Sequence, residues 1–165
     1  MSTYIIRKID DLGRIVLPKD LRKALNINSG DDFQITIDND KIVLEKFSRL
    51  EKYEDTINTI INCFYSVTNY KIYVSINNKI INFNNEEITS IISNIINTRK
   101  LYFNDKFDKN VLSNNLIVEG KIVILPIVLN SDLLGSIIII DKDNINSLIN
   151  TAKIMNNLIK KLLVY

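Results

Sequence analysis

The chain has 165 residues, 46% of them hydrophobic and 24% charged, with 21 lysines and arginines against 19 acidic residues. This length allows one domain or two small ones, and the composition is that of a soluble globular protein. The net charge of +2 is too balanced to establish a polyanionic partner by itself. The sequence contains no histidine and no Walker or dinucleotide glycine pattern, which removes Ser-His and Cys-His catalysis and histidine metal sites. We therefore predict a protein that is not an enzyme and needs no cofactor or metal.

The single cysteine, Cys63, excludes an intramolecular disulfide and is typical of a reducing compartment. The first residues lack the basic-then-apolar pattern of a signal peptide, and no apolar run reaches the roughly 18 residues that a membrane helix needs. These features predict a cytoplasmic protein without membrane contact. Cys63 lies beside Phe64 in an apolar stretch, so we expect it to be buried as a small hydrophobic residue.

The N-terminal stretch concentrates positive charge around a short turn. β-Branched residues predict strands over residues 4–9 and 14–17, separated by a polar turn over residues 10–13 in which Gly13 has a positive φ. Pro18 then suits the first turn of a helix, where its missing N–H is not needed. Six cations outnumber three acids in the first 24 residues, and such clustering attracts phosphate groups. The candidate DNA-binding residues are Arg7, Lys8, Arg14, Lys19, Arg22 and Lys23.

The same cations have a simpler interpretation as a solvated face with incidental ion pairs to Asp10, Asp11 and Asp20. On charge alone this interpretation is favoured, because exposed ion pairs are common and contribute little. We expect Asp10 and Asp11 to form and cap the turn rather than to act as a catalytic carboxylate pair.

A hairpin is predicted directly after this basic stretch. Apolar and polar residues alternate over residues 33–38, and Ile42 and Leu44 alternate in the same way after the turn at residues 38–40, which predicts a hairpin over residues 32–46. A unit this small buries too little apolar surface to be stable alone. Because a disulfide is excluded and a metal is unsupported, an obligate homodimer through residues 1–50 is the expected source of stability.

A second pattern begins at Leu50. Apolar residues spaced three and four apart predict helices over residues 50–64 and 145–163, which frame an α+β domain over residues 51–165. Both apolar seams can pack on the domain's own sheet or on a second chain. We favour the second chain, because the first helix continues from the dimerising unit. The elements expected between these helices are strands at residues 71–76, 79–83, 121–129 and 133–140, a helix at residues 86–97 and a polar loop at residues 104–115.

Two sets of residues carry a resemblance to a known family. The string RKIDDLGRIV at residues 7–16, followed by Pro18 and LRK at residues 21–23, resembles the swapped-hairpin DNA-binding domain of the AbrB transition-state regulators. The strings LPIV at residues 125–128 and IDK at residues 140–142 resemble the GAF-like C-terminal half of the SpoVT members of that family. The fold implied is α+β: a swapped-hairpin, AbrB-type β-rich domain, then a GAF-like α/β domain framed by terminal helices.

The resemblance implies a sequence-specific regulator of transcription that binds double-stranded DNA as an interleaved homodimer and controls sporulation-stage genes. It places the protein in the bacterial cytoplasm, associated with the nucleoid. It further implies a homotetramer through the helices at residues 50–64 and 145–163, and a small-molecule ligand in the GAF-like domain. Lys23 stands where the family commonly has arginine, so it keeps the charge but loses the bidentate fork that suits guanine.

Alternatives stay open for the second domain and for the function. An antitoxin-like DNA-binding autoregulator and a small-molecule-sensing GAF protein without DNA activity are the two rival functions. Six aromatic residues can line a GAF-type pocket or fill the core, and we favour the core. These residues are Tyr70, Tyr73, Phe83, Tyr102, Phe103 and Phe107.

Overall fold

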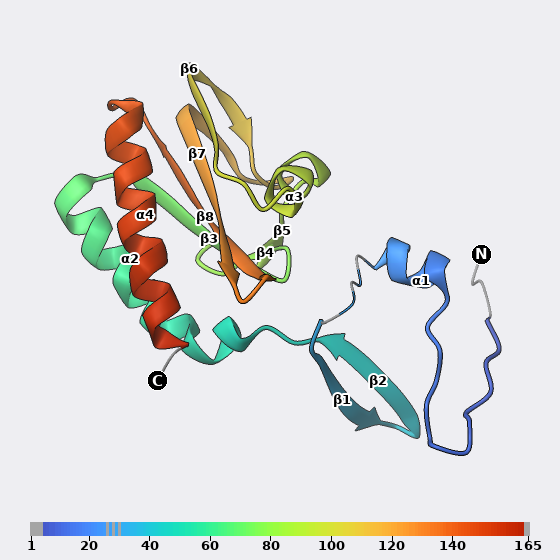
Figure 1. Cartoon of the computed structure of the whole chain (residues 1–165). Coiled ribbons are helices and arrows are strands. Elements are labelled where there is room, and N and C mark those ends of the chain that lie inside the picture. The colour runs from blue at the N-terminus through green and yellow to red at the C-terminus, as the bar shows by residue number, and fades with distance from the viewer. Residues whose placement is uncertain (1–4, 26, 28, 30, 164–165) are drawn as a thin grey trace.

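Two separate sheets organise the chain, of which the computed structural model describes residues 5–25, 27, 29 and 31–163. In chain order the elements are α1 (Lys19–Ala24), β1 (Phe33–Asp38), β2 (Lys41–Lys46), η1 (Arg49–Tyr53), α2 (Glu54–Thr68), β3 (Lys71–Ile76), β4 (Lys79–Ile80), β5 (Glu86–Glu87), α3 (Ser90–Asn97), β6 (Tyr102–Val111), β7 (Ile117–Leu129), β8 (Asp132–Asp141) and α4 (Ile145–Leu162). β1 and β2 form a two-stranded sheet, and the other strands form a six-stranded sheet in the order β5-β4-β3-β8-β7-β6. Figure 1 shows the β1-β2 hairpin projecting away from the six-stranded sheet. The α+β architecture that the sequence predicts is confirmed.

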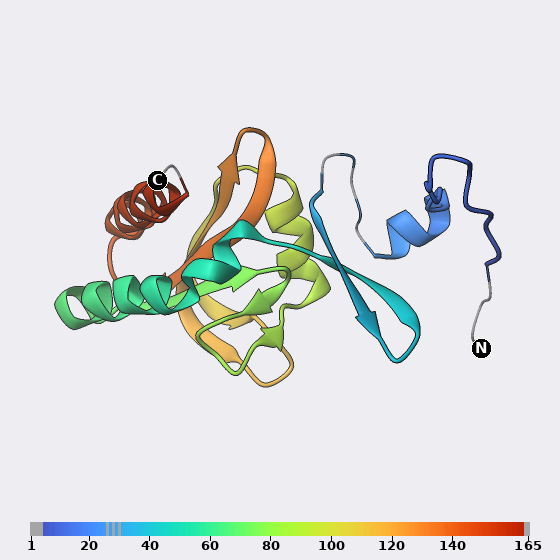
Figure 2. The same cartoon turned by 90° about the horizontal axis from the view of Figure 1, so that it is seen from below.

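Helices cover both faces of the six-stranded sheet. Figure 2 shows α2 and α4 on one side of this sheet and α3 on the other. In β8, Ile137 and Ile139 pack in the cluster under α2 and α4, whereas Ile138 and Ile140 pack in the cluster beside α3. Neighbouring residues of a strand point to opposite faces, so a strand covered on both faces needs a continuous apolar run. All four isoleucines are fully buried, and β8 is therefore a central strand, as predicted.

The strand β3 approaches β8 so closely that one position requires glycine. A Cβ built on Gly135 would lie 2.2 Å from the carbonyl oxygen of Ser75, which no real side chain tolerates. Gly135 therefore allows the two backbones to approach at the start of their shared ladder, which runs from Ser75 opposite Ser136 to Lys71 opposite Ile140.

The two apolar seams pack on the chain's own sheet, so the preference for a second chain at these residues is wrong. Leu148, Met155 and Ile159 of α4 are fully buried, and Ile57 of α2 belongs to the same core cluster. The six-stranded sheet presents an apolar face that must be covered, and the two amphipathic helices cover it. A contact of α2 or α4 with another chain would therefore use other faces of these helices. Those faces carry the exposed residues Tyr65, Val67, Ile154 and Leu158.

Cys63 is exposed, and the expectation that it is buried is wrong. The buried stripe of α2 contains Ile57 and Ile61. A residue two positions after Ile61 lies on nearly the opposite side of an α-helix, because each residue advances about 100° around the axis. Proximity to the apolar Phe64 in sequence therefore does not place Cys63 in the core.

β6 occupies a segment for which the sequence predicts a polar loop over residues 104–115. This strand lies at the edge of the six-stranded sheet and pairs with β7. Only Asn104 and Asn110 of its residues are even half-buried. Because neither face is packed in the core, polar residues are tolerated throughout and no alternation of apolar residues marks the strand.

Two other elements are shorter than predicted. The helix expected over residues 86–97 begins at Ser90, because Glu86–Glu87 pairs with β4 and the Thr89 side chain caps α3 by accepting a hydrogen bond from the Ile92 N–H. The strand expected over residues 79–83 ends at Ile80 and continues as a turn.

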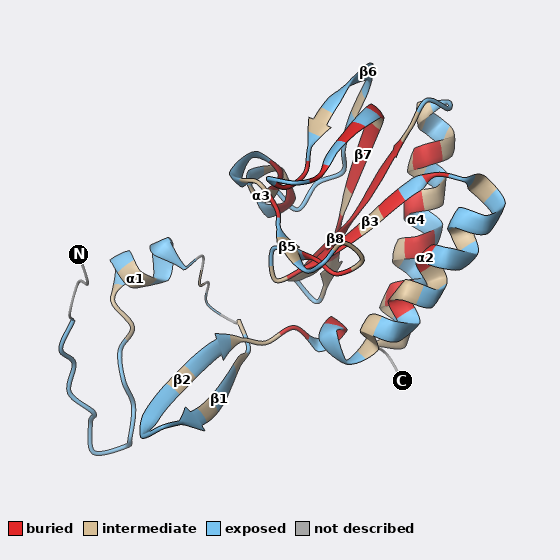
Figure 3. Ribbon diagram, turned by 180° about the vertical axis from the view of Figure 1, so that it is seen from behind, coloured by how far each residue is buried: buried red, intermediate tan, exposed pale blue. Residues whose placement is uncertain are grey.

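The two N-terminal strands predicted at residues 4–9 and 14–17 are wrong for the single chain, although Tyr4 lies outside the described residues. Residues 5–9 and 14–17 are irregular segments that belong to neither sheet in the described part of the chain. A strand forms only where its N–H and C=O groups meet a neighbouring strand, and the residues that the structure describes offer none here. Figure 3 shows this whole region in the colours of exposed and intermediate residues. The hairpin predicted over residues 32–46 is confirmed as β1-β2.

Candidate nucleic-acid interface

The polar turn at residues 10–14 is held by one carboxylate. Oδ1 of Asp10 accepts hydrogen bonds from the backbone N–H groups of Leu12, at 3.0 Å, and Arg14, at 2.8 Å. The Gly13 N–H donates to the Asp10 carbonyl at 2.9 Å, and Gly13 has a φ of 76°, as its turn position predicts. Asp10 therefore acts as the turn-forming residue that the sequence predicts.

The guanidinium of Arg14 is positioned by this turn and stays accessible. Its Nε donates to Oδ2 of Asp10 at 2.8 Å, yet 70% of the Arg14 side chain is exposed. An exposed ion pair contributes only about 0–1 kcal/mol, so it orients the guanidinium without withdrawing it from other partners. Arg14 therefore forms an ion pair with Asp10, as the simpler interpretation predicts, and its guanidinium can still bind an external anion.

The hydrogen bonds of this turn lower the pKa of Asp10. The backbone N–H of Arg14 and then its guanidinium lower the pKa of Asp10 below its ordinary value of 3.8. A lowered pKa in the folded state means that the carboxylate stabilises the turn above pH 3.8 and that this contribution is lost as the pH falls through the lowered pKa. In R14A we expect the pKa of Asp10 to rise part of the way back, because the backbone N–H bond persists. Carboxyl NMR titration measures this shift, and an unchanged pKa in R14A would contradict the role of the guanidinium.

The short helix α1 presents three further cations. Pro18 precedes its first residue, Lys19, as predicted, and Arg22 and Lys23 lie in its last turn. No residue of α1 is buried in the single chain. Leu25, just after the end of the helix, is exposed as well.

The structure of one chain does not gather the six candidate residues on a single surface. Arg7 and Lys8 lie on an extended segment, Arg14 on the turn that follows it, and the other three on α1. All six side chains are on exposed residues. Arg22 and Lys23 alone among them line a common cavity, of about 520 Å³, between α1 and the six-stranded domain.

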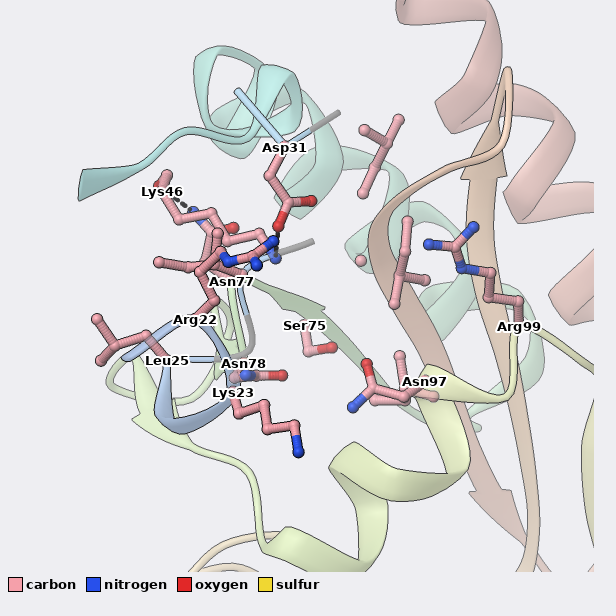
Figure 4. Close-up of a pocket in the computed structure, with 15 residues that line it drawn as sticks. Arg22, Lys23, Leu25, Asp31, Lys46, Ser75, Asn77, Asn78, Asn97 and Arg99 are labelled. Carbon is pink, nitrogen blue, oxygen red and sulfur yellow. Dashed lines mark hydrogen bonds and ion pairs between the residues drawn. The ribbon is translucent and has the colours of Figure 1, made fainter. Parts of the chain in front are cut away.

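Sequence reasoning missed the other wall of this cavity (Figure 4). Asn77, Asn78, Asn97 and Arg99 from the second domain line it together with the two α1 cations. These residues follow no motif, and only folding brings them close to α1. None of the six aromatic residues considered for a GAF-type pocket lines it. Tyr70 is buried in the core cluster under α2 and α4, and Tyr73 and Phe83 pack against the cluster beside α3, as favoured. The core prediction is wrong for Tyr102, Phe103 and Phe107, which are exposed on β6.

The described residues contain neither a metal-binding cluster nor a membrane-spanning helix. Within them, no group of three or more His, Cys, Asp and Glu side chains is arranged to hold a metal ion. No helix of that part of the chain is both long and apolar enough to span a membrane.

Comparisons with known proteins find two families that match the chain. Residues 6–52 match the family described as antidote-toxin recognition MazE, bacterial antitoxin. Residues 44–163 match the family described as stage V sporulation protein T C-terminal, transcription factor. The chain belongs to the AbrB/SpoVT family of transcription regulators. The family resemblance predicted from the sequence is confirmed.

Two relatives from Bacillus subtilis (strain 168) show how the similarity is distributed. The chain is 26% identical over 152 residues to stage V sporulation protein T, which covers 86% of this chain and 85% of the relative. It is 48% identical over 46 residues to the transition state regulatory protein AbrB, which covers 28% of this chain and 48% of that relative. The matched families are regulators rather than enzymes.

Proposed function

We propose that the protein is a sequence-specific DNA-binding regulator that works as a homodimer through residues 1–50. One observation carries the proposal: the N-terminal region combines six exposed cations with a set of large apolar side chains that its own chain leaves uncovered. Cations of this density fit a polyanion, and uncovered apolar residues of this size fit a protein partner.

The proposed DNA contacts are the six cations Arg7, Lys8, Arg14, Lys19, Arg22 and Lys23. Lysine and arginine at such positions bind backbone phosphates and release counterions, which gives affinity that depends on salt. Arginine can in addition form bidentate hydrogen bonds with guanine edges, each worth about 1–3 kcal/mol of discrimination. In a homodimer every one of these side chains is present twice, so the contacts follow a two-fold repeat in the operator.

The proposed dimer covers one face of the β1-β2 hairpin. Its register places Ile35 opposite Leu44 and Ile37 opposite Ile42, so the four side chains share one face. All four are exposed in the single chain, and 66% of Ile35 is accessible. A partner hairpin on this face would bury them, and its strands would give residues 5–9 and 14–17 the neighbours that they lack.

The second domain completes the proposal. We divide the chain into the DNA-binding domain at residues 1–50 and a GAF-like domain at residues 51–165, whose helices at residues 50–64 and 145–163 pair dimers into a tetramer through their outward faces. The relative named stage V sporulation protein T supports control of sporulation-stage genes. A regulator of this kind acts on the nucleoid in the bacterial cytoplasm.

An antitoxin-like autoregulator is the second candidate function, because residues 6–52 match a bacterial antitoxin family. Antitoxin segments that bind a toxin are commonly disordered and polar when free. Here the residues after the hairpin form a six-stranded sheet with two buried core clusters, which leaves no such segment after the hairpin in the described part of the chain. This observation favours the regulator.

Salt dependence of DNA binding tests the proposal. With a fluorescent A+T-rich duplex, we expect binding at low salt and a steep linear fall of log affinity with log salt concentration, because each phosphate contact releases counterions. Promoter fragments recovered by genome-wide footprinting should bind more tightly than this A+T-rich duplex at the same salt concentration. Protein that ignores every duplex at low salt would refute DNA binding and leave the small-molecule-sensing alternative.

A further inference from the structure

We propose that the cavity between α1 and the GAF-like domain binds a small, multiply charged phosphate-bearing molecule, and that this ligand competes with DNA for Arg22 and Lys23. The proposal that a ligand binds here rests only on the cavity. The competition rests in addition on the proposed DNA-binding function.

The charge of the cavity is the first argument. Among the described residues that line it, four are cations, Arg22, Lys23, Lys46 and Arg99, and one is an acid, Asp31. Lys46 pairs with Asp31 at 3.0 Å, which balances those two charges. Among the described residues, no ion pair engages the other three cations. The cavity therefore has a surplus of positive charge that an anion would neutralise.

The wall on the GAF-like domain is built from fixed elements. Arg99 has a φ of 59° just after α3, and its Nη1 donates to the carbonyl oxygen of Ser131 at 2.5 Å. Asn77 donates to Oε1 of Glu51 at 2.6 Å and to the carbonyl oxygen of Lys46 at 3.0 Å. These bonds hold the guanidinium and the turn at residues 77–78 in place before any ligand arrives, which lowers the entropic cost of binding.

The lining also indicates the chemical class of the ligand. The volume of about 520 Å³ lies within the range of small-molecule sites. None of the described residues that line the cavity is aromatic, so a flat apolar ligand finds no stacking surface among them. Figure 4 shows Arg22 and Lys23 on one side of the cavity and Asn97 and Arg99 on the other. Guanidinium groups bind phosphate oxygens bidentately, and amides can serve hydroxyl groups of the same molecule.

Occupation of the cavity has a direct consequence for DNA binding. Arg22 and Lys23 lie both on the cavity wall and among the proposed DNA contacts. A cation that binds a ligand phosphate inside the cavity is not available to a DNA phosphate outside it. By linkage, DNA must weaken the ligand by the same factor by which the ligand weakens DNA.

Calorimetric titration of the full-length protein with sodium pyrophosphate, at constant ionic strength, tests the site. We expect saturable binding in the wild type and at least tenfold weaker binding in R99A and in N97D, which places a negative charge on the wall. R49A is the matched control, because Arg49 is an exposed arginine paired with Asp32 at 3.3 Å and does not line the cavity. Pyrophosphate that fails to bind, or that binds R99A and N97D as well as the wild type, would overturn the proposal.

Displacement of DNA by pyrophosphate distinguishes failure of the cavity proposal from failure of the proposed DNA-binding function. Pyrophosphate should displace the fluorescent duplex from the wild type at constant ionic strength, and R99A should keep its DNA affinity but resist displacement. If DNA binds and pyrophosphate displaces it equally from R99A, the anion acts at the N-terminal surface and the cavity proposal fails. If no duplex binds, the proposed function fails, while the calorimetric result still decides the site.

Discussion

Reversal of the charge at Arg14, as in R14E, is expected to abolish binding to duplex DNA at a salt concentration where the wild type binds. The Asp10 turn points this guanidinium outward, with 70% of its side chain exposed. A base-edge contact by arginine is worth about 1–3 kcal/mol, and the proposed dimer would lose it twice and gain two repulsive carboxylates. Fluorescence anisotropy with a labelled duplex measures the loss of DNA affinity. If phosphate contacts are lost as well, the slope of log affinity against log salt concentration should become less steep.

R49E is a matched control for R14E. Arg49 is also an exposed arginine, with 55% of its side chain accessible, and it is also paired with an aspartate, Asp32. Both variants change the net charge equally, so a general loss of attraction for DNA would affect both. A second control, R14K, keeps the positive charge but loses the bidentate hydrogen-bonding geometry of the guanidinium. It should retain non-specific binding while losing discrimination between sequences. If R14E and R49E bind DNA equally, Arg14 is not a specific contact.

The core of the GAF-like domain could be predicted from the sequence because its burial dictates its pattern. The apolar run Ile137–Ile140 predicts a strand covered on both faces. The spacing of apolar residues in α4 predicts an amphipathic helix. The structure contains both. β6 escaped prediction because an edge strand whose side chains are mostly exposed leaves no hydrophobic pattern to detect. The seam residues of α2 and α4 were assigned to the wrong partner because periodicity shows that a face is buried, but not what covers it.

The candidate site also contains one part that could be predicted from the sequence and one part that could not. The turn at residues 10–14 could be predicted because local chemistry determines it: Asp10 caps neighbouring N–H groups and Gly13 takes a positive φ. The cavity could not, because only the tertiary fold makes Arg22 and Arg99 line the same cavity, and no local rule links them. The strands predicted at the N-terminus fail for a third reason. Their sequence favours β-structure, but the described part of the single chain contains no strand that pairs with them.

Substitution of Ile35 by lysine, as in I35K, is expected to convert the dimer into monomers and to abolish DNA binding with it. Ile35 is 66% exposed in the single chain and shares its face with Leu44, Ile37 and Ile42. If a partner hairpin covers this face, the variant loses about 1.5–3 kcal/mol of apolar burial at each copy. It also places an unpaired ammonium group in the interface, which costs several kcal/mol more. Sedimentation equilibrium over a range of protein concentrations measures the change.

The variant I91K makes this prediction specific. Ile91 on α3 is 70% exposed, so the two substitutions add the same charge at nearly equal exposure. In an isolated chain both would change the free energy of unfolding by less than about 0.5 kcal/mol, because surface substitutions away from structural features have small effects. Dimer dissociation in I35K but not in I91K therefore identifies the hairpin face as the interface. An intact dimer in I35K would show that the apolar face is not what joins the chains, and the two-fold arrangement of the DNA contacts would then have no structural basis.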